Sequence, residues 1–362
     1  MTEQAEQVQG APAKKPASRT RRIVQGVLTA ILVAAILWYT LKDTDFAAVW
    51  ANIRAMTWLE MATLVLISLW NLITYQLVWM ACTPGLKFGQ ALTLSQSSTA
   101  VGNTLPAGAA FGVALTYEML GSWGFSRSRT TLPILVSGVW NSFAKLGLPV
   151  LALALLALQG NASPSRVTGA LAGIAGLVAA VAVFAAMLRS ERVAERVGVL
   201  AGQAASRALR LIGRPPVHGW EIATTRFRSK TIGLVSHRWL PITAATLVSH
   251  LSLYLVLLVT LRHVGVSNAE VNWIEILALF AFARLATAIP ITPGGVGVVE
   301  FVLIAGLVGA GGDKPEVVAA VLVYRALTYL LPVPIGVALY LRWRRGTWAS
   351  RTDKAPAVEG SP

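Results

Sequence analysis

Residues 289–300 read IPITPGGVGVVE, a stretch that places two prolines, three glycines and a glutamate inside an apolar region. Proline interrupts helical hydrogen bonding, and a carboxylate costs free energy at membrane depth. Broken backbone is tolerated at that depth only where protein buries it or where it lines a watery cavity. The stretch therefore predicts a turn between two half-helices, whose free amides and carbonyls can face a substrate.

The rest of the chain supports a membrane location. Of its 362 residues, 55% are hydrophobic and 13% are charged. Apolar blocks of about 20 residues match a hydrocarbon core roughly 30 Å thick. We therefore predict an all-α polytopic membrane protein with six full spanning helices, which leaves little room for a separate soluble enzyme domain. The predicted spans are residues 21–42, 58–80, 132–158, 167–188, 238–261 and 316–341.

The net charge of +15 is concentrated in three segments. Residues 1–22 carry five Lys and Arg against two Glu, residues 189–230 nine against three, and residues 342–362 five against two. By the positive-inside rule, both termini and the basic loop 189–237 are predicted to lie on the cytoplasmic side of the cytoplasmic membrane. Residues 1–20 are predicted to be a disordered tail and residues 342–362 a second cytoplasmic tail.

Composition also narrows the function classes. The single cysteine, Cys82, excludes an internal disulfide and a multi-cysteine metal site. The four histidines lack metal-ligand spacing, and His250 is expected to be a packing residue within a helix. We expect no metal and no cofactor. Nucleic acid is not an expected partner, because membrane topology and attraction to anionic lipid heads account for the distribution of positive charge.

A second interrupted region precedes the first, and other elements recur with it at nearly the same spacing. TLPAG at 104–108 matches ITPGG at 291–295, and VWNSFAKLGLPV at 139–150 matches VYRALTYLLPVP at 323–334. Upstream, the helix that starts at Trp58 precedes the one that starts at Trp239 by a similar interval. These matches indicate an internal repeat of helix, hairpin and helix, with a first half at about 58–158 and a second half at about 238–341.

Flanking charges indicate that the two copies are inverted. Lys87, Arg127 and Arg129 place the ends of the first hairpin at the cytoplasmic side, whereas Glu270 and Asp313 are typical of the opposite side. Each hairpin is either re-entrant or barely spanning. Paired Pro/Gly-interrupted segments in an inverted repeat point to a transporter's site, although Gly and Pro also kink packed helices. The candidate residues are Asn103, Pro106 and Gly108 in the first hairpin and Pro293, Gly294, Gly295 and Gly297 in the second.

Ionisable and amide side chains within apolar segments complete the candidate substrate path. They are Arg284, Glu300, Arg325, Lys145 and Asn141, the last being the repeat partner of Arg325. One interpretation places the three cations around an anionic group, with Glu300 as counter-ion, because guanidinium groups match phosphate oxygens. The alternative is a structural salt bridge from Glu300 to Arg325 or Arg284 that fixes helix packing. Separately, the arginines of 189–230 among Ala, Val and Leu predict an amphipathic helix on the inner leaflet.

The residues quoted above resemble a known family. IPITPGGVGVVE, with Arg284 before it and YRALTYLLPVPIG (324–336) after it, is similar to the C-terminal signature of the lysylphosphatidylglycerol synthase transmembrane, flippase-like family. GNTLPAGAAFGVALTYEML (102–120) resembles an earlier stretch of that family. By position, the signature residues are Pro293, Gly294, Gly295, Gly297 and Glu300, and Arg325 matches a family arginine.

The resemblance implies a lipid-flippase-like module, which in relatives moves an aminoacylated phospholipid to the outer leaflet. Those relatives carry an aminoacyltransferase domain after the membrane part, whereas this chain stops at Pro362, shortly after its last predicted span. We therefore expect no enzyme activity. The first half also differs, reading FGVALTYE and VWNSFAK where many members carry charged residues.

Two functions remain open at this point. The first is a translocase for a phospholipid or a lipid-linked anionic molecule, with membrane lipids as its partners. The second is a non-transporting membrane partner of a lipid-modifying or glycosyl-transferring enzyme, recruited through the basic segment. Besides membrane lipids, the possible partners are a membrane enzyme and a second copy of the chain.

Overall fold

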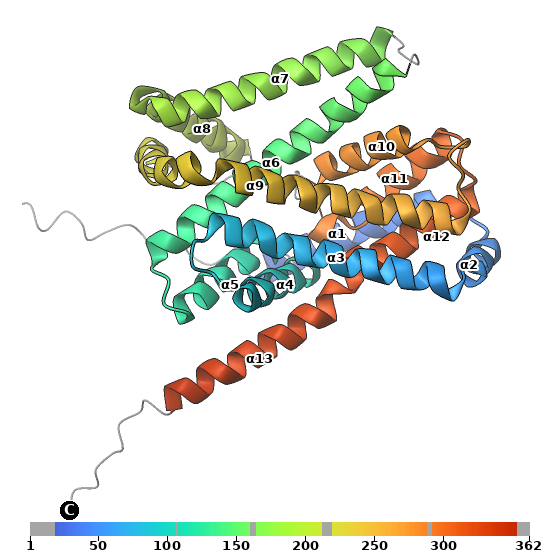
Figure 1. Ribbon diagram of the computed structural model, residues 1–362, viewed down its shortest axis with the longest axis horizontal. Coiled ribbons are helices and arrows are strands. Elements are labelled where there is room, and N and C mark those ends of the chain that lie inside the picture. Colours follow the sequence, from blue (N-terminus) through green and yellow to red (C-terminus); the bar gives the residue numbers. More distant parts are fainter. Residues whose placement is uncertain (1–18, 106–107, 160–163, 212–218, 288–291, 353–362) are drawn as a thin grey trace, which may run out of the picture.

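The protein is described by a computed structural model covering residues 19–105, 108–159, 164–211, 219–287 and 292–352. These residues form thirteen α-helices with one short 3-10 and one π-helical segment, and no strand (Figure 1). Five of the helical segments described are long and apolar enough to cross a membrane, and a sixth is added if α1 and α2 form one bent span. This confirms the prediction of an all-α polytopic membrane protein.

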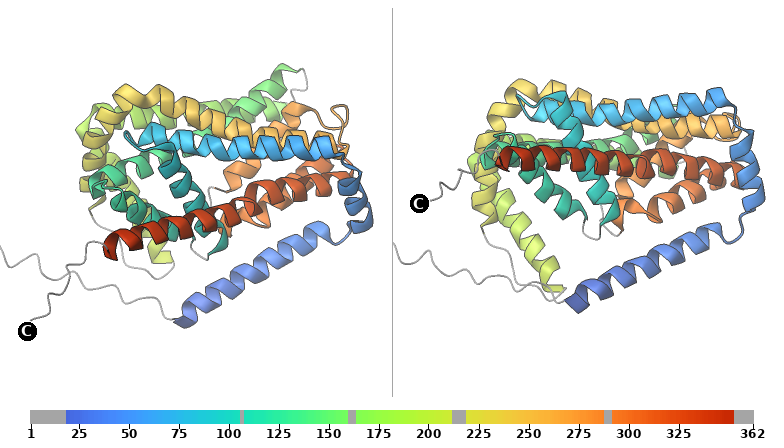
Figure 2. Two further views of the ribbon diagram at one scale, coloured as in Figure 1. Left: turned by 60° about the horizontal axis from the view of Figure 1, so that its bottom comes forward. Right: turned by 90° about the horizontal axis from the view of Figure 1, so that it is seen from below.

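The first predicted span differs in shape from a simple helix. α1 (Arg19–Leu41) turns by 81° into α2 (Phe46–Ala55). The Asp45 carboxylate caps α2 by accepting from the backbone N–H groups of Ala47 and Ala48 at 2.9 and 3.1 Å. α1 packs on α11 and otherwise stands away from the bundle (Figure 2).

The first half has the predicted pattern of helix, hairpin and helix. Thr57 and the N3 residue Glu60 form a capping box at the start of its first helix. The hairpin helices α4 and α5 approach closely at Gly108, where a Cβ atom would lie 2.5 Å from the Val101 carbonyl oxygen. The elements are α3 (Trp58–Cys82), α4 (Phe88–Thr104), α5 (Gly108–Ser122) and α6 (Arg127–Leu158).

The described residues of the segment 189–237, which was predicted as a basic loop, are mostly helical. α7 (Pro164–Arg189) is followed by α8 (Glu191–Leu211), the amphipathic helix that the sequence predicts. α9 (Trp220–Val264) then runs for 45 residues with Pro241 in its interior, so the second half begins before residue 238. α8 packs on both α7 and α9 (Figure 1).

The second half repeats the pattern of the first. Its last span is interrupted by a π-helical segment and continues as helix to Thr352, so the expected tail is helical over 342–352. Residues 1–18 and 353–362, which belong to the predicted tails, lie outside the described residues. The elements after α9 are α10 (Trp273–Ala286), η1 (Pro293–Gly295), α11 (Val298–Gly309), α12 (Lys314–Arg325), η2 (Ala326–Leu330) and α13 (Pro332–Thr352).

The two halves run in opposite directions. α3 and α9 lie side by side and antiparallel, and the α4/α5 and α10/α11 hairpins enter from opposite ends of the bundle (Figure 1). The end of the bundle that holds α4 and α5 also holds α8 and the end of α13 (Figures 1 and 2). The tips of the hairpins meet, since α4 contacts η1. The largest apolar core, which includes Phe280, Leu257 and Leu307, lies among α9, α10, α11 and α12.

Candidate functional site

The PGG turn breaks the second hairpin where the sequence predicts a break. Gly294, Gly295 and Gly297 have φ values of +58°, +71° and +82°. Glycine adopts this left-handed region without the steric cost that other residues incur. The Gly295 N–H donates to the Thr292 carbonyl at 3.1 Å and closes the turn. The three glycines thus reverse the chain before α11 begins at Val298.

Glu300 anchors this turn from the first helical turn of α11. Its Oε2 accepts from the Gly297 N–H at 2.7 Å, and its Oε1 accepts from Arg325 Nε at 2.7 Å. The two side chains are only 10% and 13% exposed, so both charges are largely removed from solvent. A buried carboxylate of this kind is tolerated because it is paired and hydrogen-bonded. This is the salt bridge that the sequence offered as an alternative.

Arg325 stands at the junction of α12 and the π-helical segment η2. Its Nη2 donates to the Gly294 carbonyl at 3.3 Å, and its guanidinium carbon lies 4.4 Å from the centre of the Tyr329 ring. That distance is within the range of a cation–π interaction. π-helical turns occur often at functional sites because they redirect side chains within a helix. Here the guanidinium connects the turn with η2.

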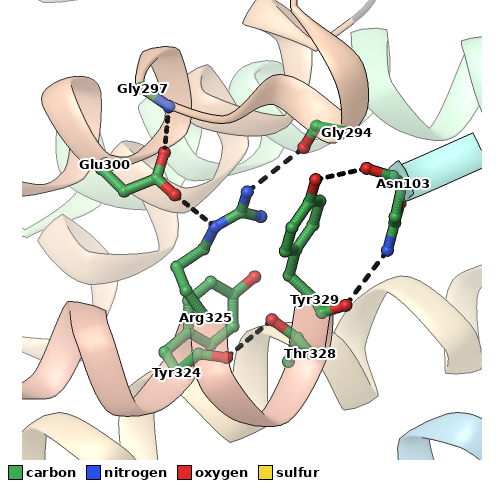
Figure 3. A network of polar contacts seen from close by, with 8 residues as sticks. All are labelled: Asn103, Gly294, Gly297, Glu300, Tyr324, Arg325, Thr328 and Tyr329. Atoms are coloured by element: carbon green, nitrogen blue, oxygen red, sulfur yellow. Dashed lines mark hydrogen bonds and ion pairs between the residues drawn. The ribbon is translucent and has the colours of Figure 1, made fainter. Parts of the chain in front are cut away.

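Tyr329 extends these contacts to the first hairpin. Its hydroxyl donates to the Asn103 carbonyl at 2.6 Å, and Asn103 Nδ2 donates to the Tyr329 carbonyl at 3.2 Å. Figure 3 shows the resulting inter-hairpin network, which joins α4, η1, α11 and η2. It consists of Asn103, Gly294, Gly297, Glu300, Arg325 and Tyr329. Five of these six residues were predicted, and the structure brings them together.

Two predicted cations do not join this network. Lys145 on α6 and Arg284 on α10 lie within electrostatic range of each other and of His250 on α9. Among the described residues, Glu300 forms an ion pair with Arg325 alone. Glu300 thus stands as the counter-ion of Arg325, and the predicted arrangement of three cations around an anionic group stays a prediction.

The remaining predicted residues form no side-chain hydrogen bond within the described part of the chain. Asn141 is half-buried on α6, and Gly108 starts α5. Gly295 belongs to the turn itself, as does the backbone of Pro293. Pro106 lies outside the described residues.

Sequence reasoning missed two residues. Tyr329 follows Lys145 at the same spacing that relates Asn141 to Arg325, so the repeat itself carried a signal for it. His250 was expected to be a satisfied packing histidine. Its Nε2 is instead buried without a hydrogen-bond partner among the described residues, which no sequence pattern indicated. Within the same residues, no group of three His, Cys, Asp or Glu side chains is placed to hold a metal ion.

Comparison with known proteins agrees with this architecture. A family model described as the lysylphosphatidylglycerol synthase TM region matches residues 24–336. The chain belongs to this family. A curated relative, the inner membrane protein YbhN of Escherichia coli (strain K12), is 36% identical over 72 residues. That match spans 20% of this chain and only 23% of the relative. The family and the apolar helices together make the chain a multi-pass membrane protein.

Proposed function

We propose that the protein is a translocase that moves a phospholipid or a lipid-linked anionic molecule across the cytoplasmic membrane. The observation that carries the proposal is the inter-hairpin network, a buried ion pair and its partners at the point where hairpins from opposite ends of the bundle meet. Ionisable groups inside membrane segments are costly, usually face the bundle interior and are candidates for a substrate path by default.

The network defines what would have to change during transport. Headgroup passage between the hairpin tips requires the contacts of Tyr329 with Asn103 and of Arg325 with Gly294 to open. Glu300 remains bonded to the Gly297 N–H within its own hairpin and keeps the turn intact. Opening from one side and then the other would give the inverted halves alternating access to the headgroup.

The proposal includes an orientation and a chemical role. The basic α8 and the basic end of α13 lie at one end of the bundle, which we assign to the cytoplasm by the positive-inside rule (Figure 1). Both termini are then cytoplasmic. We assign the chain no chemistry on the lipid itself, because the network offers an ion pair and hydrogen bonds but no pair of nucleophile and base.

The test is headgroup translocation in proteoliposomes with labelled phospholipids and a polyprenyl phosphate. We expect wild type to move one lipid class and Glu300→Gln to lose most of that activity. Glu118→Gln is the matched control, because Glu118 is an exposed carboxylate on α5 outside the network. Equal activity of the two variants would refute the role of the network.

A different outcome would favour the non-transporting alternative. Folded wild-type protein that moves no lipid, together with loss of cellular function when α8 is replaced by a neutral helix, would indicate a scaffold. The observation behind that alternative is the exposed basic surface around Arg189, Arg192 and α8, next to α9.

A further inference from the structure

Three basic side chains outside the inter-hairpin network form a cluster of their own. Lys145, His250 and Arg284 come from α6, α9 and α10, three helices that pack against one another. Each pair among them lies within electrostatic range. No acidic side chain among the described residues contributes to the electrostatic surroundings of Lys145 or His250. Lys145 and His250 therefore lie in cationic surroundings.

Several polar atoms of this cluster lack partners among the described residues. Arg284 Nε and His250 Nε2 are buried without a hydrogen bond in the described part of the chain. Lys145 forms neither a hydrogen bond nor an ion pair with any residue there. His250 is 6% exposed. Buried polar groups are nearly always hydrogen-bonded in native proteins. The two unpaired buried nitrogens of Arg284 and His250, beside the half-buried Lys145, therefore indicate a bound ligand.

The tautomer of His250 determines what that ligand offers. His250 Nδ1 lies 3.0 Å from the Thr246 carbonyl oxygen, which can only accept a hydrogen bond. Nδ1 therefore carries the proton, and Nε2 of the neutral ring is an acceptor. The cluster thus presents two cationic donors and one acceptor.

We propose that this cluster binds the headgroup of a phosphate-monoester lipid. A monoester carries up to two negative charges, which match Lys145 and Arg284, and its monoanion keeps a P–OH that can donate to His250 Nε2. Its second ionisation falls near pH 6, so both forms are present near neutrality. A diester phosphate has one charge and no P–OH. The proposal rests on the proposed translocase function and specifies its substrate class.

The experiment compares two lipids that differ by one methyl group. Binding of dioleoyl phosphatidate and of dioleoyl phosphatidylmethanol, in which that methyl replaces the P–OH hydrogen, is measured on the purified full chain in detergent by native mass spectrometry. We expect the monoester to bind about tenfold more tightly, the equivalent of roughly 1.4 kcal/mol. His250→Phe should abolish this preference, and Arg284→Gln should weaken both lipids.

His237→Phe is the matched control, since His237 is an exposed histidine on the same helix, and it should keep the wild-type preference. Equal binding of the two lipids to the wild-type protein would by itself overturn the proposal. So would a preference that survives in folded His250→Phe or, should that variant not fold, in His250→Gln. Displacement of phosphatidate by millimolar inorganic phosphate would overturn the lipid assignment in favour of free phosphate.

The outcome is separable from that of the translocase proposal. A tenfold monoester preference without movement in proteoliposomes would leave the binding site standing and refute transport. Movement of diester lipids without any preference would refute the monoester site and leave transport standing.

Discussion

Each half of the protein has a helix after its hairpin, α6 in the first half and α12 with η2 in the second, and each carries a side chain directed to the opposite hairpin. In the second half this side chain is Tyr329, which exchanges two hydrogen bonds with Asn103 on α4. In the first half the equivalent residue is Lys145, which lies within electrostatic range of Arg284 on α10. One contact is neutral and satisfied, and the other is cationic and unsatisfied.

The two halves of the repeat therefore differ in what this position does: one half forms contacts that stabilise the bundle, and the other does not. The position of Arg325 with its carboxylate in the second half corresponds to Asn141 in the first, where no ion pair forms among the described residues. The inter-hairpin network therefore holds the bundle together, while the Lys145 cluster leaves its donors and acceptor free for a ligand. Removing charge from the two places should have opposite consequences for stability.

The largest effect is expected for Arg325→Gln. It leaves the buried Glu300 without its cation, and breaking a buried pair in this way costs about 3–5 kcal/mol. Thermal denaturation followed by size-exclusion chromatography in detergent should show a large loss of folded protein. The double variant with Glu300→Gln should recover part of the loss, because no unpaired charge remains. Arg129→Gln, which removes an exposed arginine of α6, is the control and should leave stability unchanged.

A smaller effect is expected for Gly294→Ala. The residue has φ +58°, and an added Cβ would collide with the Tyr329 ring. Left-handed backbone at a residue other than glycine costs about 1–3 kcal/mol. The same denaturation assay should detect the loss. Gly102→Ala on α4 has no atom within 4 Å of its new methyl group, and it should be neutral. Equal stability of the two alanine variants would contradict the requirement for glycine at the turn.

Tyr329→Phe should cost less again. It removes the 2.6 Å hydrogen bond to the Asn103 carbonyl but keeps the ring under the Arg325 guanidinium. The net contribution of one such bond is about 1 kcal/mol. Hydrogen exchange should rise at the end of α4 more than in α10. A variant with unchanged exchange at α4 would contradict the view that Tyr329 ties the two hairpin tips together.

The smallest change is expected for Lys145→Gln, which should leave stability equal to wild type or raise it slightly. Lys145 has no ion pair among the described residues and faces a second cation, Arg284. Removing a like charge relieves repulsion rather than breaking a bond. The measurement is again thermal denaturation without added lipid. A loss of stability as large as that of Arg325→Gln would contradict the claim that only the second half uses its cation to stabilise the fold.

The fold followed from sequence because its signals are local or periodic. Apolar blocks, the charge distribution and the Pro/Gly turns at 104–108 and 291–295 predicted the spans, the hairpins and their inversion. The amphipathic helix α8 was predicted from its arginines among Ala, Val and Leu. The helical start of α9 and the helical end of α13 were missed, because arginine-rich segments resemble solvent-exposed loops when charge alone is read.

The site was predicted only in part for a different reason. Sequence identified Glu300 and Arg325 as costly in a membrane and even named their pairing as an alternative. It could not choose between Arg284 and Arg325 as the partner of Glu300, because which cation reaches the carboxylate depends on how the helices pack. The role of His250 depends on a tautomer fixed by the Thr246 carbonyl, and no pattern of residues reports that.

The length of α9 has a mechanical consequence. Its 45 residues amount to about 68 Å of helix, more than twice the thickness of a hydrocarbon core of roughly 30 Å. Its first turns run at an angle to the remainder, so the helix is bent rather than straight (Figures 1 and 2). It carries the surface on which α8 packs at one end and His250 further along. A displacement of α8 therefore reaches the side chains around His250 only through this bent helix, in which Pro241 interrupts the hydrogen bonds.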